Sequence, residues 1–348
     1  MRLSTTMLWL SLASASTVQA DEPAFSYNFY SSIRMQAETV VPDNQQIMSG
    51  YRGLRDAYSR VGFNAAYEFS QNTSLFAQLE LPFDSANFRF RDSYDQGEAG
   101  RDKKENIRVG LIGLTSQAGR ITAGQQWMPY YNAITFPVDQ FSSFYSGFAT
   151  YTTFRVKETL AYESPIFWNG FSLGGSYSTR HGNNRSPSRI DDRRIQAVAS
   201  YQFADKTRLA IGMDDRGNGS GYKDRLYGLT LSHAKGSWSW AAKYEITDTD
   251  NPNSFYGDRA QAFNLYSAYY QGKNTYKIML ANVEAYGEAV IHLGIDHRIN
   301  QDLRLFAEFY QEQETAAMTA KQAGLDGFDA NIRGGKLFLV GFRYDLNM

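Results

Sequence analysis

The sequence contains no cysteine and only 8 prolines in 348 residues. Disulfide bonds are therefore excluded, and the rigidity of the chain must come from another source. After residue 20 there is no apolar run near the ~18 residues that a transmembrane helix requires. Lysine and arginine (35) nearly balance aspartate and glutamate (36), so the formal net charge is −1. Nucleic-acid-binding proteins usually carry a basic surface, so we expect no nucleic-acid partner.

Motifs for catalysis and cofactor binding are also missing. There is no P-loop, dinucleotide fingerprint or nucleophile elbow. The four histidines are scattered, and His292 and His297 stand five residues apart, which places them on opposite faces of a strand. The run 248–253 begins like a calcium loop but has Asn253 in place of glycine and Arg259 in place of glutamate. We expect no catalytic residues, metal site or cofactor, although outer-loop acids could still bind a divalent ion loosely.

The first twenty residues form a unit of their own. Arg2 precedes an apolar run from Met7 to Ala13, and the segment ends in Val18-Gln19-Ala20. A positive start, a short apolar stretch and small residues near the end are typical of a secretory signal peptide. We predict a signal peptide over 1–20 and a single domain over 21–348. A buried N-terminal helix is the alternative.

The chain is rich in aromatic residues, with 24 tyrosines and 23 phenylalanines, and these follow a two-residue period. From Phe25 to Ala37 the odd positions are mainly apolar and the even positions mainly polar. This alternation is about as long as a tilted membrane-spanning strand requires. The mean hydropathy of −0.47 would suggest a soluble protein. In a transmembrane barrel, however, polar lumen residues offset the lipid-facing ones and hide the membrane signal.

Short and long connections alternate along the chain. The predicted short turns are 116–119, 166–170, 204–206, 234–237, 272–274 and 300–302. The predicted long connections include 40–56, 84–105, 181–192, 217–224, 248–259 and 315–335. Outer-membrane barrels have short periplasmic turns and long outer loops. The pattern predicts an all-β transmembrane antiparallel barrel of about 16 strands, with 14 to 18 possible, and both termini on the periplasmic side.

One long connection differs from the others. The stretch Gly124–Arg155 contains many aromatic residues, two prolines and a single acidic residue, Asp139. A connection of this length needs a structural reason, because loops are usually only a few residues long. We predict that it folds into the lumen and constricts it. Its aromatic side chains would pack against the wall or form a path for sugars.

Several stretches resemble the general diffusion porins of Gram-negative outer membranes. These are 59–63, 76–80, 107–114, 119–127 and 160–165, together with the long third loop. The resemblance is specific over about residues 25–180 and architectural beyond. It implies a sixteen-stranded homotrimeric channel in the outer membrane, in contact with lipid and lipopolysaccharide, that passes small hydrophilic solutes and ions. The chain ends in Met348, whereas the family usually ends in an aromatic residue.

The resemblance also implies the residues of the pore constriction. Family members place basic side chains on the wall opposite acidic groups on the third loop. Carried over by motif, the constriction residues are Arg34, Arg60, Glu80, Arg108, Asp139 and Arg155. Alternation places Arg34, Arg60, Glu80 and Arg108 on the even, polar face of their strands, which agrees with a shared lumen. Ordinary solvated wall residues are the alternative.

Three functions fit this sequence. A passive channel requires a charged wall and no catalytic cluster, which is the pattern present. A substrate-selective porin is the nearest alternative. An outer-membrane enzyme would need a smaller barrel with aspartate, histidine or serine gathered at one rim, so the scattered histidines favour a channel.

Overall fold

The computed structural model of this protein describes residues 24–46, 49–91, 107–146, 150–179, 193–204, 206–217, 221–252, 254, 256–284, 287–314 and 333–348. The predicted signal peptide 1–20 lies outside these residues, as do His181, Phe148 and most of the charged connection 84–105. Within the described ranges no helix is long and apolar enough to cross a membrane.

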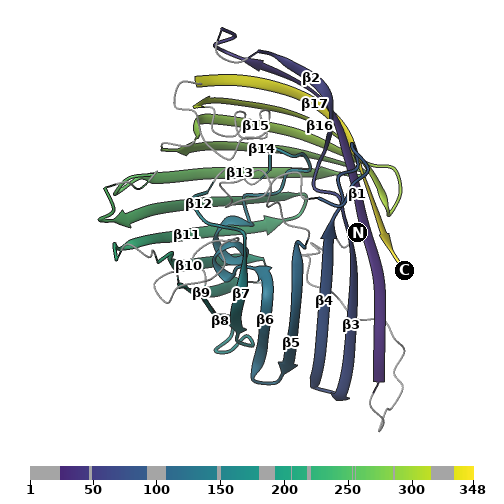
Figure 1. Ribbon diagram of the computed structural model, residues 1–348, viewed down its shortest axis with the longest axis vertical. Helices are drawn as coiled ribbons and strands as arrows, with labels where there is room; N and C mark the ends of the chain where they lie inside the picture. The colour runs from purple at the N-terminus through teal and green to yellow at the C-terminus, as the bar shows by residue number, and fades with distance from the viewer. Residues whose placement is uncertain are drawn as a thin grey trace.

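The described residues form one antiparallel sheet of seventeen strands (Figure 1). They are β1 (Ala24–Pro42), β2 (Tyr51–Asp56), β3 (Arg60–Ser70), β4 (Thr73–Pro82), β5 (Val109–Ser116), β6 (Gly119–Trp127), β7 (Arg155–Glu163), β8 (Phe171–Ser178), β9 (Arg194–Ala204), β10 (Thr207–Asp215), β11 (Asp224–Lys235), β12 (Trp238–Thr249), β13 (Gln261–Gln271), β14 (Asn274–Val283), β15 (Gly287–Arg298), β16 (Leu303–Glu314) and β17 (Arg333–Asn347). From β3 onward, consecutive strands pair with one another.

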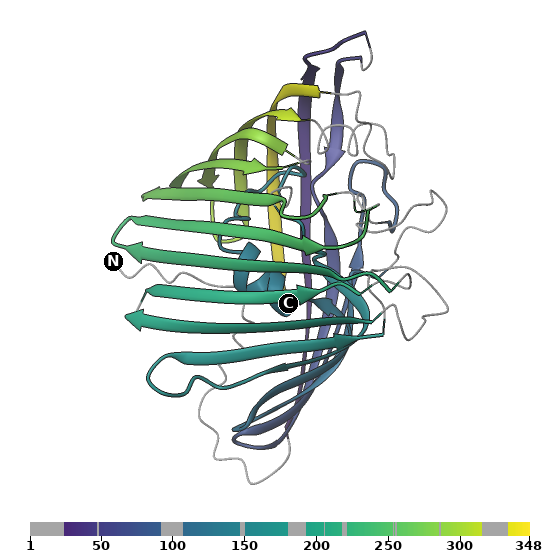
Figure 2. The same ribbon diagram turned by 90° about the vertical axis from the view of Figure 1, so that its left-hand side faces the viewer.

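The sheet closes because its first and last strands also pair. β1 and β17 are hydrogen-bonded from the pair Tyr30 and Asn347 to the pair Pro42 and Gly335. Figures 1 and 2 show the sheet curving round until these two strands lie side by side. A closed barrel satisfies the backbone of every wall strand without a free edge, which is what a strand-built membrane protein requires.

β2 and β3 together form one strand of the barrel. β2 pairs with residues 35–40 of β1, and β3 pairs with residues 24–32 of the same strand. The seventeen segments therefore make a closed sixteen-stranded barrel, as the alternation predicted. The predicted polar loop 40–56 is wrong in extent. β2 begins at Tyr51. β1 continues to Pro42, because Val40 and Val41 favour strand geometry and Val40 is buried.

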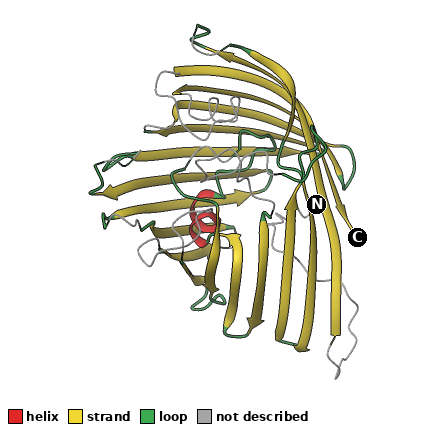
Figure 3. Cartoon of the chain, viewed as in Figure 1, coloured by secondary structure: helices red, strands yellow, loops and turns green. Residues whose placement is uncertain are grey.

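The connection between β6 and β7 is residues 128–154, called the inward loop below. It begins with a π-helix, Tyr131–Thr135, the one helix among the described residues (Figure 3). This helix packs against β10 and β11 from inside the barrel. The prediction of a third loop folded into the lumen is therefore confirmed.

The predicted loop bounds Gly124–Arg155 are too wide. Gly124–Trp127 continue β6, and Arg155 is the first residue of β7. The register between the two strands shifts between Gly124 and Gln126, where β7 carries one extra residue, and Glu158 has a positive φ of 52°. A β-bulge of this kind breaks the two-residue alternation, so the alternation could not be followed to the true ends of β6 and β7.

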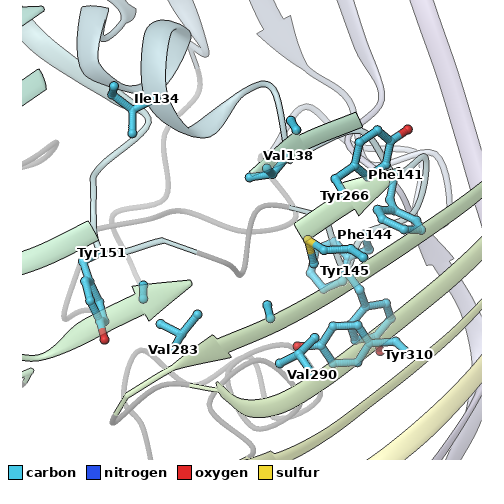
Figure 4. Packing of buried hydrophobic residues seen from close by; sticks show 14 of the residues in the cluster. Ile134, Val138, Phe141, Phe144, Tyr145, Tyr151, Tyr266, Val283, Val290 and Tyr310 are labelled. Carbon is cyan, nitrogen blue, oxygen red and sulfur yellow. The ribbon is translucent and has the colours of Figure 1, made fainter. Parts of the chain in front are cut away.

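The largest buried apolar cluster lies between the inward loop and the barrel wall (Figure 4). The loop contributes Tyr130, Ile134, Val138, Phe141, Phe144, Tyr145 and Tyr151. The wall contributes Tyr266, Met279, Val283, Val290 and Tyr310, among others. The prediction that the loop aromatics pack against the wall is confirmed for Tyr130, Phe141, Phe144, Tyr145 and Tyr151.

The two faces of the strands differ as predicted. On β1 the outward odd positions Phe25, Tyr27 and Phe29 are exposed, whereas the inward positions Gln36 and Glu38 are buried. His292 and His297 lie on opposite faces of β15, the first buried and the second exposed. The alternation of lengths among the connections also agrees with the prediction, except that β14 and β15 are joined by only a few residues.

Candidate functional site

A cluster of charged side chains lies at the end of β4. Glu80 is buried, and its Oε1 lies 2.9 Å from Nε of Arg108. Its Oε2 lies 3.3 Å from Nε of Arg60 and accepts a hydrogen bond of 3.1 Å from the hydroxyl of Tyr30. Two guanidinium groups thus share one carboxylate, so this cluster has an excess of positive charge.

Arg60 and Arg108 reach Glu80 in different ways. Arg60 is paired with Pro82 across β3 and β4, and it shares the inner face with Glu80. Arg108 precedes β5, whose odd positions face inward because Val109 pairs with Glu80. The expectation that the even positions of this segment face inward is wrong, although Arg108 itself does reach Glu80. A bend before β5 and a backbone bond from Arg108 N to the Glu80 carbonyl bring its guanidinium into the cluster.

Arg34 lies beside this cluster, in a row with two other arginines. Arg304, Arg343 and Arg34 are cross-strand partners on β16, β17 and β1, so the three occupy one face. Nε of Arg34 donates a 2.8 Å hydrogen bond to Ser32, whose strand partner is Arg60. The acidic partners of this row include Asp345, which lies 2.6 Å from Arg343.

Asp139 and Arg155 both lie near Tyr131, a residue of the inward loop. The hydroxyl of Tyr131 donates a 2.7 Å hydrogen bond to Asp139. Burial raises the pKa of Tyr131 well above its ordinary value, Asp139 raises it further, and Arg155 acts in the opposite direction. The guanidinium of Arg155 lies 5.0 Å from the ring centre of Trp127. Of the six predicted constriction residues, Arg60 and Arg108 each contact Glu80. Arg34 and Arg155 are close enough to interact with this cluster electrostatically, and Asp139 is bonded to Tyr131 in the inward loop.

The far side of the inward loop is bonded to a second charged cluster on β14, β15 and β16. Glu308 accepts a 2.8 Å hydrogen bond from the backbone N–H of Ser142 and lies 2.9 Å from Nε2 of His292. Lys277 forms an ion pair of 2.9 Å with Asp296 and donates to the backbone carbonyl of Gln140. These charges are used to hold the loop on the wall.

The ring of Phe141 covers the second cluster. It stacks on His292 with ring centres 3.5 Å apart and planes inclined by 9°. His292 is fully buried as a result. The cluster is thereby shielded from the lumen, whereas Arg60 and Arg343 near the first cluster remain partly exposed.

A third contact holds the π-helix. Tyr130 donates a 3.1 Å hydrogen bond to Glu245, which also binds Lys243 and Thr150. Gly212 and Gly228 are cross-strand partners on β10 and β11. A Cβ atom at Gly228 would overlap the Tyr130 hydroxyl and lie 2.7 Å from Ile134. The glycine pair thus forms the hollow in the wall that receives the helix.

The constriction residues inferred from the family resemblance did not include the charged clusters that bind the inward loop or the row of three arginines. The missed residues are Arg304, Arg343, Lys243, Glu245, Lys277, His292, Asp296 and Glu308. Each occupies the inward position of its strand, so alternation alone could have identified them as lumen residues. Which of them the loop would cover could not be read from alternation.

Among the described residues, no three histidine, aspartate or glutamate side chains are arranged to hold a metal ion. The polar side chains described above instead form ion pairs and hydrogen bonds with one another or with the loop backbone. A closed barrel with charged side chains on its inner face and an aromatic exterior is suited to passing water-soluble species.

The family model described as Gram-negative porin matches residues 4–317. This chain belongs to the Gram-negative porin family. The porin is an outer-membrane β-barrel that forms a channel for the passive diffusion of small hydrophilic solutes. No curated protein sequence matches this porin.

Solved porin structures have the same fold. The anion-selective porin from Comamonas acidovorans is similar with a TM-score of 0.72 and 16% identity, over 93% of this chain and 100% of that one. OmpF of Salmonella typhi, in complex with daunomycin, has a TM-score of 0.67 and 15% identity, over 92% and 97% of the two chains. The trimer form of OmpT, an outer membrane protein of Vibrio cholerae, has a TM-score of 0.62 and 14% identity, over 93% and 100%.

Proposed function

We propose that the inward loop is the constriction of this channel and that Arg34, Arg60, Glu80, Arg108, Asp139 and Arg155 line it. The observation that carries the proposal is the bonding of the loop across the lumen. The loop leaves the wall at Trp127 and its far side binds Glu308, at a distant part of the barrel. A segment held in this way narrows the passage between itself and the remaining wall.

The charges beside the open part of the passage favour anions. Arg60 and Arg108 share a single acid, Glu80, and the arginine row adds positive charge next to them. A few charges in a narrow passage outweigh the net charge of the whole chain. The channel therefore prefers anions weakly and becomes more selective as ionic strength falls. The structurally similar porin from Comamonas acidovorans is anion-selective.

We also propose that the chain is cleaved after its signal peptide 1–20. The mature barrel 21–348 inserts among lipid and lipopolysaccharide and forms a homotrimer. It discriminates little between small solutes and catalyses no reaction. His292 supports the last point, because Phe141 and Glu308 cover it and leave it no access to a solute.

Reversal potentials across a KCl gradient test the selectivity. We expect the wild type to prefer chloride and the variant with Arg60→Ala and Arg108→Ala to lose most of this preference. Arg225→Ala is the matched control, because Arg225 pairs with Asp215 at a barrel end, where bulk salt screens it. A wild type that prefers potassium, or a double variant with an unchanged reversal potential, would refute the assignment of these arginines.

Removal of 141–148 tests the constriction itself. The shortened protein should insert into bilayers and conduct more current per channel than the wild type. An unchanged conductance in correctly folded protein would mean that the loop does not form the narrowest part of the channel.

A further inference from the structure

Tyr58 occupies an unusual position in the wall. It lies in the break between β2 and β3, flanked by the buried residues Ala57 and Ser59. Its φ of 67° is in the left-handed region, which a bulky residue rarely adopts. The carboxylate of Asp56 accepts the backbone N–H groups of both Tyr58 and Ser59 and fixes this conformation. Strained backbone of this kind persists only where the surroundings determine it.

The side chain of Tyr58 binds the inward loop at Phe144. Its hydroxyl donates a 3.0 Å hydrogen bond to the Phe144 carbonyl, and the two rings have centres 5.2 Å apart. The N–H of Phe144 is bound at 2.9 Å by the side chain of Gln36 on β1. Both backbone groups of Phe144 are therefore held by this side of the wall.

The same tyrosine contacts both arginines of the Glu80 cluster. The guanidinium of Arg108 lies 5.9 Å from the ring centre of Tyr58. Nη1 of Arg60 donates a 3.3 Å hydrogen bond to the Tyr58 carbonyl. Tyr58 is thus the residue through which the loop and the two arginines are connected.

We propose that Tyr58 is a positioning residue that sets the distance between the inward loop and the Arg60–Arg108 pair, and with it the width and selectivity of the channel. The proposal rests on the constriction proposed above. The hydroxyl binds the loop backbone, and the face of the ring holds the Arg108 guanidinium by a cation–π contact. Without the left-handed turn, the side chain of residue 58 would not reach both partners.

The chain has no cysteine, so a single nitroxide label can report on the loop. Ser146→Cys places the label next to the Phe144 contact, at a partly exposed position. We would compare label mobility, single-channel noise, conductance and reversal potential in the wild type, Tyr58→Phe and Tyr58→Ala, using protein extracted from outer membranes. Tyr58→Phe should raise the mobile fraction of the label about five-fold, as expected from the loss of one net hydrogen bond. Its reversal potential should change less than that of Tyr58→Ala, because its ring still supports Arg108.

Tyr58→Ala should raise label mobility further and also weaken the anion preference. Tyr162→Phe is the control, because the Tyr162 hydroxyl donates a similar hydrogen bond to Ala118 at a turn remote from the loop. Equal label mobility in Tyr58→Phe and the wild type would overturn the proposal. Raised mobility with unchanged channel noise and conductance would support the role of Tyr58 in holding the loop and refute the proposed constriction instead.

Discussion

The Nε atom of Arg108 lies 2.9 Å from Oε1 of Glu80, although the two residues are 28 positions apart and Arg108 is not part of a strand. The same carboxylate lies 3.3 Å from Arg60. Glu80 is therefore the acid that offsets the positive charge of this part of the lumen. Its removal changes the local charge by one unit while the backbone around it stays bonded to both neighbouring strands.

Glu80→Gln is expected to strengthen the preference for anions. The amide keeps the shape and the acceptor oxygen of the side chain but leaves Arg60 and Arg108 without a counter-charge. We expect the anion-to-cation permeability ratio to rise roughly two- to five-fold, for a change of about 0.4–1 kcal/mol in ion free energy. Reversal potentials measure this ratio. Asp248→Asn, which removes the partly exposed partner of Lys223, should leave it unaltered, and equal ratios in the two variants would contradict the prediction.

Gly228→Ala is expected to displace the π-helix. The added Cβ would overlap the Tyr130 hydroxyl and crowd Ile134, so the helix must move away from β11 toward the lumen. The bond between Tyr130 and Glu245 would then be lost. Single-channel conductance should fall. Gly287→Ala is the control, because the nearest atom to its Cβ would be a side-chain methyl of Val290 at 3.3 Å, a contact less close than those at Gly228. If both alanine variants conduct like the wild type, the helix does not border the open passage.

Glu308→Gln is expected to loosen the far side of the inward loop. The neutral side chain weakens the bonds to His292 and to the backbone of Ser142 in a buried site. Weakening buried hydrogen bonds to a charged group costs about 1–3 kcal/mol. The channel should close at lower applied voltage, and the folded barrel should convert to the unfolded form at lower temperature on gels. Asp215→Asn, at a barrel end, should change neither property, and a Glu308→Gln protein that matches it would argue against this anchor.

Alkaline pH provides a test of the buried loop tyrosines. Burial, reinforced by nearby acids, raises the pKa of Tyr130, Tyr131 and Tyr145 well above the ordinary value of about 10. Because the folded protein holds these protons more tightly, their contribution to stability is complete below pH ~10 and is lost as the pH rises above it. Tyrosinate absorbance should show a set of tyrosines that ionise only on unfolding. Replacing these three by phenylalanine should remove three members of that set, and an unchanged number would contradict the assignment.

The proposed homotrimer should resist sodium dodecyl sulfate and be modified by heat. The exposed aromatic surface of β1 and β3, which includes Phe25, Tyr27, Phe29 and Phe69, is large enough to need cover by lipid or by another subunit. An unboiled sample should migrate well above the boiled monomer on a gel. A gently solubilised, unboiled sample that stays at monomer size would count against the trimer.

The two-residue alternation by itself determined the wall of this protein. Apolar side chains at Phe25, Tyr27 and Phe29 face outward, and Gln36 and Glu38 face inward, because a strand places successive side chains on opposite faces. The positions of the short turns could also be predicted from the sequence, because short polar stretches interrupt the alternation between consecutive strands. These are local properties, which depend only on neighbouring residues.

Only the tertiary structure decided the path of the inward loop and the use of the lumen charges. Phe144 is bound by Gln36, which is 108 residues away, and Ser142 by Glu308, which is 166 residues away. Such contacts exist only because the barrel closes and brings distant strands around the loop. Arg108 enters the Glu80 cluster from a bend, and Tyr58 through a left-handed break, so both depart from the alternation. A two-residue pattern describes regular strands, so it placed Arg34, Arg60 and Glu80 on the inner face. It could not place Arg108 and Tyr58, which lie where the strands are irregular.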